Sequence, residues 1–158
     1  MEVADLSIPG VDPRSWSLSY NENSSVESID GPLFGNADLQ SFTYDLVGNL
    51  TSVTNSSGHV KTFSNYNGFG SPQKIVDENG RITELTYSSR GWITQSIIKN
   101  STAAGIVDAV TLYEYDGLGQ IIKTTSAEGE IIEYEYDDAR RLVAIENGFG
   151  ERLEYVLD

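Results

Sequence analysis

His59 is the only histidine in this 158-residue chain, and there is no cysteine. A catalytic histidine needs a nucleophile and an orienting carboxylate in one pocket. His59 instead directly follows Gly58 in a predicted turn, where an exposed strand start is expected. The lack of cysteine excludes a thiol nucleophile, a thiolate zinc site and disulfides. We therefore predict that the chain is not an enzyme.

Aspartates are the other candidates for chemistry, because carboxylates bind metal ions. Asp137 and Asp138 are adjacent, but the chain contains no D-x-D-x-D-G loop of the kind that binds calcium. Asp, Asn or Ser also recurs at one position of a repeat, which favours capping of turns over metal binding. The sequence predicts no metal and no cofactor.

Charge and hydropathy limit the partners. The formal net charge of −14 argues against nucleic acid and anionic membranes. No apolar run approaches the roughly 20 residues of a membrane helix, so no membrane insertion is expected. Residues 1–10 lack the basic start and apolar stretch of a signal peptide, so we expect no targeting signal in this chain.

A repeat must position these residues. The motif Tyr-x-Tyr-Asp occurs at 113–116 and again at 134–137. Taking the second tyrosine as the anchor, equivalent positions follow at steps of 24, 22, 21, 28 and 21 residues. The anchor tyrosines are Tyr20, Tyr44, Tyr66, Tyr87, Tyr115 and Tyr136, and Leu157 has the same place at the end. We predict an N-terminal segment at 1–12 and a repeat array at 13–158.

Each anchor is followed by a turn. Asp45, Asp116 and Asp137 come directly after their anchors, and Asn or Ser follows the others. Four residues after the anchor stand Gly48, Gly70, Gly91 and Gly119, which predicts positive φ there. Ser24 and Arg140 replace glycine in two copies, and we expect those turns to be looser or differently shaped.

A second turn begins eleven residues after the anchor, for example at Asn55 and Asp77. Two turns per repeat imply two strands per repeat, and the segments between turns are short, β-branched and aromatic. The sequence thus predicts an all-β chain of about six antiparallel hairpins in a curved or spiralling ribbon. The longer steps add residues at 31–35 and 100–105, and both insertions should emerge on one edge of the ribbon.

The strand before each anchor should have two unlike faces, because side chains alternate. The anchor face carries aromatic and aliphatic residues such as Phe42, Leu85 and Tyr134. The opposite face carries Ser, Thr and glutamates such as Glu114, Glu133 and Glu135. Phe63, Leu112 and Val156 are exceptions to this rule. The strand after the anchor turn alternates less cleanly, which indicates a bulge near the glycine.

These motifs resemble the Rhs, or YD-repeat, family, whose signature is Y-D-x-x-G-[RN]-L. Residues 44–50 match it closely, and the similarity extends from about residue 13 to Asp158. Known members are bacterial polymorphic toxins, insecticidal toxin-complex proteins and teneurins. In these a spiralling strip of hairpins closes into a hollow shell, which sequesters a C-terminal toxin in the bacterial members. The family's self-cleavage region has no match here, nor does a toxin domain.

The resemblance implies a structural scaffold: a section of the shell of a secreted or surface-delivered protein, whose partners are the remainder of the shell and its cargo. The alternative is a carbohydrate or cell-surface binding module, because rows of tyrosine can bind sugars. Packing across strands is the simpler role for the tyrosines, and a sugar site would lie on the inserted loops. A strip of about six repeats leaves strand edges and an aromatic face uncovered, so we also expect the isolated chain to self-associate through its terminal strands or its tyrosine face.

Overall fold

The computed structural model describes residues 15–33, 35–99 and 107–156. These residues form one antiparallel sheet of thirteen strands, in which the spatial order equals the sequence order. The predicted all-β ribbon of hairpins is thus confirmed. The strands are β1 Ser17–Tyr20, β2 Val26–Asp30, β3 Gln40–Tyr44, β4 Leu50–Thr54, β5 Val60–Tyr66, β6 Pro72–Val76, β7 Ile82–Tyr87, β8 Ile93–Ile98, β9 Ala109–Tyr115, β10 Ile121–Thr125, β11 Ile131–Tyr136, β12 Leu142–Asn147 and β13 Arg152–Glu154.

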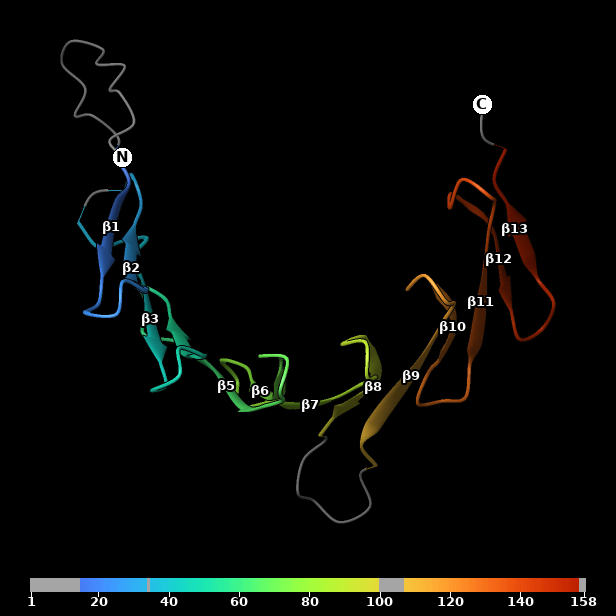
Figure 1. Cartoon of the computed structure of the whole chain (residues 1–158), viewed down its shortest axis with the longest axis horizontal. Coiled ribbons are helices and arrows are strands. Elements are labelled where there is room, and N and C mark those ends of the chain that lie inside the picture. The colour runs from blue at the N-terminus through green and yellow to red at the C-terminus, as the bar shows by residue number, and fades with distance from the viewer. Residues whose placement is uncertain (1–14, 34, 100–106, 157–158) are drawn as a thin grey trace, which may run out of the picture.

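The sheet is an open arc. Figure 1 shows β1 and β13 at its two ends, with the intervening hairpins following one another along the curve. Every strand contacts only the strands before and after it in the sequence. The predicted N-terminal segment, 1–12, lies outside the described residues, as do Phe34, residues 100–106, Leu157 and Asp158.

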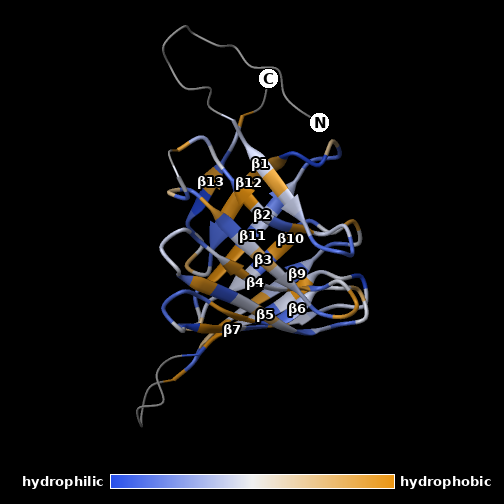
Figure 2. Cartoon of the chain, turned by 90° about the vertical axis from the view of Figure 1, so that its left-hand side faces the viewer, coloured by the Kyte–Doolittle hydropathy of each residue, from blue (hydrophilic) through white to orange (hydrophobic). Residues whose placement is uncertain are grey.

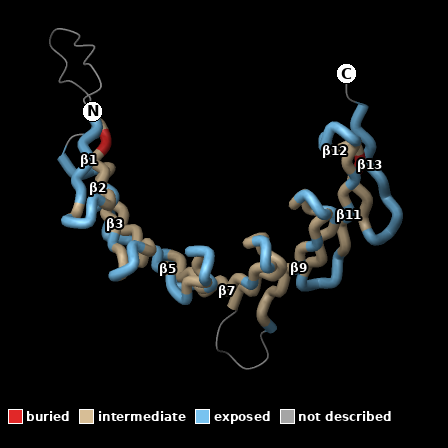
Figure 3. Tube along the Cα trace, viewed as in Figure 1, coloured by how far each residue is buried: buried red, intermediate tan, exposed pale blue. Residues whose placement is uncertain are grey.

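Very little of the sheet is buried, as expected of a single layer. In the described ranges only Gly31 and Ala144 belong to the interior, and Ala144 is 1% exposed. Figure 3 shows half-buried strands joined by exposed turns along the whole arc. Tyr44, Tyr87, Tyr115 and Tyr136 are half-buried, whereas Glu114, Glu133 and Glu135 are exposed. The predicted contrast between the two faces is therefore present, although no anchor tyrosine is fully buried.

Bulges displace the register beside the anchors. In five hairpins the pairing shifts between the anchor and the residue before it: Tyr44 pairs with Leu50, but Thr43 pairs with Ser52. The extra residue, here Thr51, lies in the strand after the turn. Leu50 and Val53, three apart, therefore both pair with anchor-face residues, and this explains why alternation is weak there. Figure 2 shows the resulting mixture of hydrophilic and hydrophobic residues along the strands.

The hairpin of β5 and β6 differs, and it corrects one assignment. Tyr66 pairs with Pro72 and Ser64 with Lys74, so one residue of each strand, Asn65 and Gln73, lies between these pairs and the register does not shift. In the other hairpins only the strand after the turn has such a residue, so β5 has one more than its counterparts, Asn65, whose φ is 56°. Phe63 then pairs with Ile75 on the anchor face. The prediction that Phe63 lies on the opposite face is wrong, because Asn65 reverses the alternation. Leu112 does lie on the polar face as predicted, where it is 43% exposed.

The two insertions join β2 to β3 and β8 to β9. Both connections run from the second strand of one repeat to the first strand of the next, so they share a ribbon edge with the second turns. Asp38 Oδ2 accepts a hydrogen bond from the Leu33 backbone nitrogen at 3.1 Å within the first insertion. The second insertion, 100–105, lies outside the described residues.

Candidate functional site

His59 is exposed at the beginning of a strand, as the sequence predicts. Its Nδ1 atom lies 3.3 Å from Asn55 Nδ2 and 4.0 Å from a carboxylate oxygen of Glu78. No hydroxyl nucleophile is among these contacts. Residues 15–33, 35–99 and 107–156 contain no group of three His, Cys, Asp or Glu side chains placed to hold a metal ion. No helix of the described chain is long and apolar enough to cross a membrane.

Within residues 15–33, 35–99 and 107–156 the recurring Asp, Asn and Ser residues instead form one type of turn, which occurs ten times. In one example the Asp45 nitrogen donates to the Asn49 carbonyl at 2.9 Å, and the Gly48 nitrogen donates to the Asp45 carbonyl at 3.1 Å. Asp45 Oδ1 also accepts from the nitrogens of Val47 and Asn49. The side chain thereby accepts hydrogen bonds from two backbone nitrogens that have no backbone acceptor within the tight turn. The ten turns begin at Asn21, Asp45, Asn55, Asn67, Asp77, Ser88, Asp116, Ser126, Asp137 and Asn147.

The fourth residue of all ten turns has positive φ. Gly48, Gly70, Gly91 and Gly119 have φ between 75° and 93°, as predicted. Ser24 and Arg140 have φ of 61° and 65° and keep the same two backbone hydrogen bonds. The expectation that these two turns are looser is wrong: the hydrogen bonds fix the backbone, and the non-glycine residue takes the strained conformation.

Hydrogen bonds stabilise the charged form of three turn aspartates. Bonds from Asn49 lower the pKa of Asp45, and the backbone nitrogens of Gln120 and Arg141 lower the pKa values of Asp116 and Asp137 respectively. Arg141 Nε also donates to Asp137 Oδ2 at 2.8 Å. Each of these carboxylates thus accepts hydrogen bonds from within its own turn and thereby stabilises the backbone of that turn.

The anchor tyrosines make a hydrogen bond that also recurs. The hydroxyl of Tyr115 donates to the backbone carbonyl of Ile93 at 2.7 Å. Ile93 pairs with Tyr87, the preceding anchor. Each anchor from the second to the sixth therefore bonds the carbonyl opposite the anchor one repeat earlier. The five pairs are Tyr44 with Val26, Tyr66 with Leu50, Tyr87 with Pro72, Tyr115 with Ile93 and Tyr136 with Ile121. We call this bond the anchor clamp.

The anchor clamp closes a gap between repeats. The ladder between β10 and β11 covers residues 123–125 and 131–133 and does not include Ile121. The strands of successive repeats thus stop pairing before the anchor turn, and the tyrosine hydroxyl reaches across to the first residue of the earlier strand. Partial burial at this joint raises the pKa values of Tyr66, Tyr87, Tyr115 and Tyr136.

A second contact between repeats forms around Trp92. Its ring lies 5.3 Å from the ring of Tyr115, and the guanidinium of Arg90 lies 5.2 Å from the Trp92 ring. Arg90 Nη1 donates to the Gly117 carbonyl at 2.6 Å. A Cβ atom on Gly119 would come within 2.8 Å of the Trp92 ring. Gly119 thus serves both the positive φ of its turn and the close approach of Trp92.

The polar face becomes charged toward β13. Register places Glu114, Lys123, Glu133, Glu146 and Arg152 in one row across five strands. Arg152 contacts the two oxygens of Glu135 at 2.5 and 2.7 Å, Glu146 at 3.3 Å and Glu154 at 2.9 Å. These bonds raise the pKa of Arg152 and lower the pKa of Glu135. One arginine thus offsets the mutual repulsion of glutamates from three strands.

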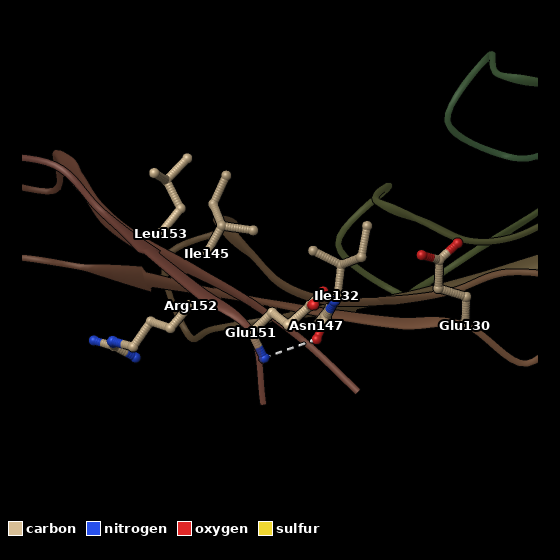
Figure 4. A pocket seen from close by; sticks show the side chains of 7 residues that line it. All are labelled: Glu130, Ile132, Ile145, Asn147, Glu151, Arg152 and Leu153. Carbon is tan, nitrogen blue, oxygen red and sulfur yellow. Dashed lines mark hydrogen bonds between the residues drawn. The ribbon is translucent and has the colours of Figure 1, made fainter. Parts of the chain in front are cut away.

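A shallow concavity lies on the anchor face beside this row. Figure 4 shows Ile132, Ile145 and Leu153 pointing to one side of the sheet, whereas Arg152 points away from them. Asn147 Nδ2 donates to Glu151 Oε2 at 2.6 Å at its rim. The residues that line it include no histidine, serine or cysteine.

Sequence reasoning located the anchors and the turns but missed the anchor clamp. A signal for it was available: tyrosine, never phenylalanine, occupies all six anchor positions from Tyr20 to Tyr136. Packing alone would accept either residue, so strict use of the hydroxyl indicates a hydrogen bond. The acceptor could not be found, because it depends on where the ladder between repeats ends.

The described geometry defines a non-closed ribbon of clamped β-hairpins. The family model of the teneurin YD-shell matches residues 10–156, and the chain belongs to this family. The Rhs/YD-repeat resemblance is thereby confirmed.

Solved structures share the fold. The chain resembles the crystal structure of TcdB2-TccC3 with a TM-score of 0.71 and 16% identity, over 96% of this chain and 9% of that one. The crystal structure of TcdB2-TccC3-Cdc42 matches with a TM-score of 0.70, at the same identity and coverage. The chain thus spans less than a tenth of the length of these proteins. No curated protein matches the chain in sequence.

Proposed function

We propose that this chain is a non-catalytic section of the wall of a YD shell, which encloses or presents a toxin or effector domain outside this sequence. The anchor clamp carries the proposal: five copies of one bond join successive hairpins into a continuous strip. In the described residues the turns use their carboxylates and amides on their own backbone, so the repeated side chains support the wall.

The proposed partners are the remainder of the shell and its cargo. The family match over residues 10–156 and the 9% coverage of the TcdB2-TccC3 structure support this assignment, since a short strip of a large shell gives such coverage. We propose that the protein that contains this strip is secreted or displayed at the cell surface, in keeping with its membership of the teneurin YD-shell family. We also propose that the isolated strip self-associates through its terminal strands or its tyrosine face.

Segment replacement in a known shell tests the function. Residues 15–156 would replace the matched segment of a YD shell, and the cargo's resistance to protease would be measured. We expect an assembled shell that protects its cargo. A parallel replacement carrying Phe at positions 44, 66, 87, 115 and 136 keeps the rings but removes every hydroxyl, and should protect less. Full assembly without cargo protection would refute the enclosing role.

A further inference from the structure

We propose that the open edge of β1 is a docking edge for one antiparallel strand of the YD type, and that the hydroxyl of Tyr20 donates to the backbone carbonyl of that strand's first residue. The inference rests on the proposed function and specifies its partner at one end of the strip. Five internal joints show what such an edge binds.

Tyr20 is the one anchor whose acceptor is missing in the described part of the chain. Its side chain is 58% exposed and makes no hydrogen bond there, whereas the other five anchors are half-buried and clamped. The preceding residues on the same face, Trp16 and Leu18, are 67% and 48% exposed. In the described sheet β1 pairs only with β2.

The composition of β1 suits strand addition. Residues 15–21 contain no charge and no proline. Natural sheet edges commonly carry charges, proline or bulges that prevent pairing. β13, at the other end, is only three residues long and contains Arg152 and Glu154. The two edges therefore differ, and β1 is the one without protection.

The internal joints also fix the register. At four of the five, the residue two after the clamp acceptor pairs with the residue three before the anchor: Ser28 with Ser41, Lys74 with Glu84, Gln95 with Leu112 and Lys123 with Glu133. The joint of β4 and β5 differs by one residue because of Asn65. Applied to Tyr20, the rule places the partner's third residue opposite Ser17.

The partner is thus a strand that follows a turn beginning with Asp, Asn or Ser and has an apolar first residue, as the five internal acceptor strands do. A peptide copying residues 116–126 meets this description, since Ile121 would be its clamp acceptor and Lys123 its third strand residue. The peptide contains no tryptophan and has one acidic and one basic residue, so its net side-chain charge is close to zero.

Position-specific cross-linking tests the docking. The chain has no cysteine, so Ser17→Cys introduces a single thiol. It would be incubated in a thiol-disulfide buffer with excess peptide carrying Lys123→Cys or, as the matched control, Thr124→Cys, at a chain concentration at which sedimentation shows monomers. We expect a disulfide with the first peptide and little with the second, whose thiol lies on the other face. Hydrogen exchange of the β1 amides should slow when unmodified peptide is added.

Removing the hydroxyl distinguishes the clamp from simple stickiness. Tyr20→Phe should weaken peptide binding by about threefold to tenfold, as loss of one hydrogen bond does. Tyr134→Phe is the control, because Tyr134 makes no hydrogen bond within the described residues and lies far from β1. Equal cross-linking of both peptides, or binding that Tyr20→Phe leaves unchanged, would overturn the inference. Position-specific docking together with a failed shell replacement would reject the enclosing function alone.

Discussion

At the scale of single residues, each recurring side chain makes the same hydrogen bond in successive repeats. The residue after the anchor bonds two backbone nitrogens of its own turn, and the anchor tyrosine bonds a carbonyl one repeat away. Both interactions are made to the backbone of the described chain. The recurrence of Tyr and Asp is therefore explained by the backbone, which needs the same bonds in every copy.

Two glycines with similar φ values allow the cost of close packing to be separated from the cost of backbone conformation. Gly48 and Gly119 have φ of 90° and 93°, but only Gly119 faces an obstacle, the Trp92 ring. Gly48→Ala should cost about 1 kcal/mol of unfolding free energy from positive φ alone. Gly119→Ala should cost roughly 1–3 kcal/mol more, because the added methyl group displaces Trp92. Urea unfolding of both variants measures the difference, and equal losses would contradict the role of Trp92.

Removal of one hydroxyl measures the anchor clamp. Tyr115→Phe loses the bond to Ile93 and leaves a partly buried carbonyl without its donor, so it should lower the unfolding free energy by about 1 kcal/mol. Tyr113→Phe, two residues earlier on the same face, loses no hydrogen bond within the described chain and should be nearly neutral. Denaturant titration of the two variants checks this, and a similar loss for both would mean that ring packing dominates.

At the scale of elements, the hairpin proves to be a fixed unit that tolerates several sequences. The turn keeps its two backbone hydrogen bonds with Asp, Asn or Ser at its first position and with Gly, Ser or Arg at its fourth. The bulge beside the anchor recurs in five hairpins. The hairpin is therefore specified by its hydrogen bonds taken together, and a residue that does not suit its position, such as Ser24 or Arg140, takes a strained backbone conformation.

Arg140 is such a residue. Its φ of 65° is costly for a residue with a side chain, and Arg140→Gly should stabilise the chain by up to about 1 kcal/mol. Ala139→Gly, one position earlier and without positive φ, should be neutral or destabilising. Thermal unfolding compares the two. A loss of stability in Arg140→Gly would show that the arginine side chain contributes more than its backbone strain removes.

The clamped tyrosines predict a loss of stability at alkaline pH. Burial raises the pKa values of Tyr66, Tyr87, Tyr115 and Tyr136 above the ordinary value of 10.0, so the folded state holds these protons more tightly than the unfolded state. This contribution is fully present below pH 10 and is lost as pH rises through the folded pKa values. Urea midpoints at neutral pH and above pH 10 would measure it. The loss should be smaller in Tyr115→Phe, and an identical loss would attribute it to other groups.

Much of the element was predictable and some was not. Period-two alternation and turn residues determine the strands, because they act locally. The step of 22 residues from Tyr44 to Tyr66 indicates one additional residue but not its position, and at Asn65 it turns Phe63 to the other face. The shapes of the Ser24 and Arg140 turns were misjudged for a related reason. Propensity describes what a residue prefers alone, whereas the surrounding bonds decide what it adopts.

At the scale of the whole molecule, the strip has two faces and almost no interior. Apolar side chains such as Ile132, Ile145 and Leu153 share the anchor face, and no second layer of the described residues covers them. The opposite face collects glutamates toward β13. A charge of −14 then opposes association of strips that their apolar face favours.

Salt should shift this balance. Screening shortens the reach of the charges to about 8 Å at physiological ionic strength and to about 3 Å at 1 M, but leaves apolar contact intact. We expect the isolated chain to associate at high concentration, and more so as salt is added. Sedimentation velocity over a series of salt and protein concentrations measures this. A compact monomer throughout, or dissociation with added salt, would contradict the prediction.

The sequential strand order has a mechanical consequence. Because each strand touches only the strands before and after it, a force that pulls the two ends apart loads one hairpin at a time, starting from an edge. The hairpins of such a strip should therefore unfold one after another, and each released hairpin should lengthen the chain by a similar increment. The resistance between successive repeats comes from one ladder and one anchor clamp, so the described sheet is weakest at its two edge strands, β1 and β13.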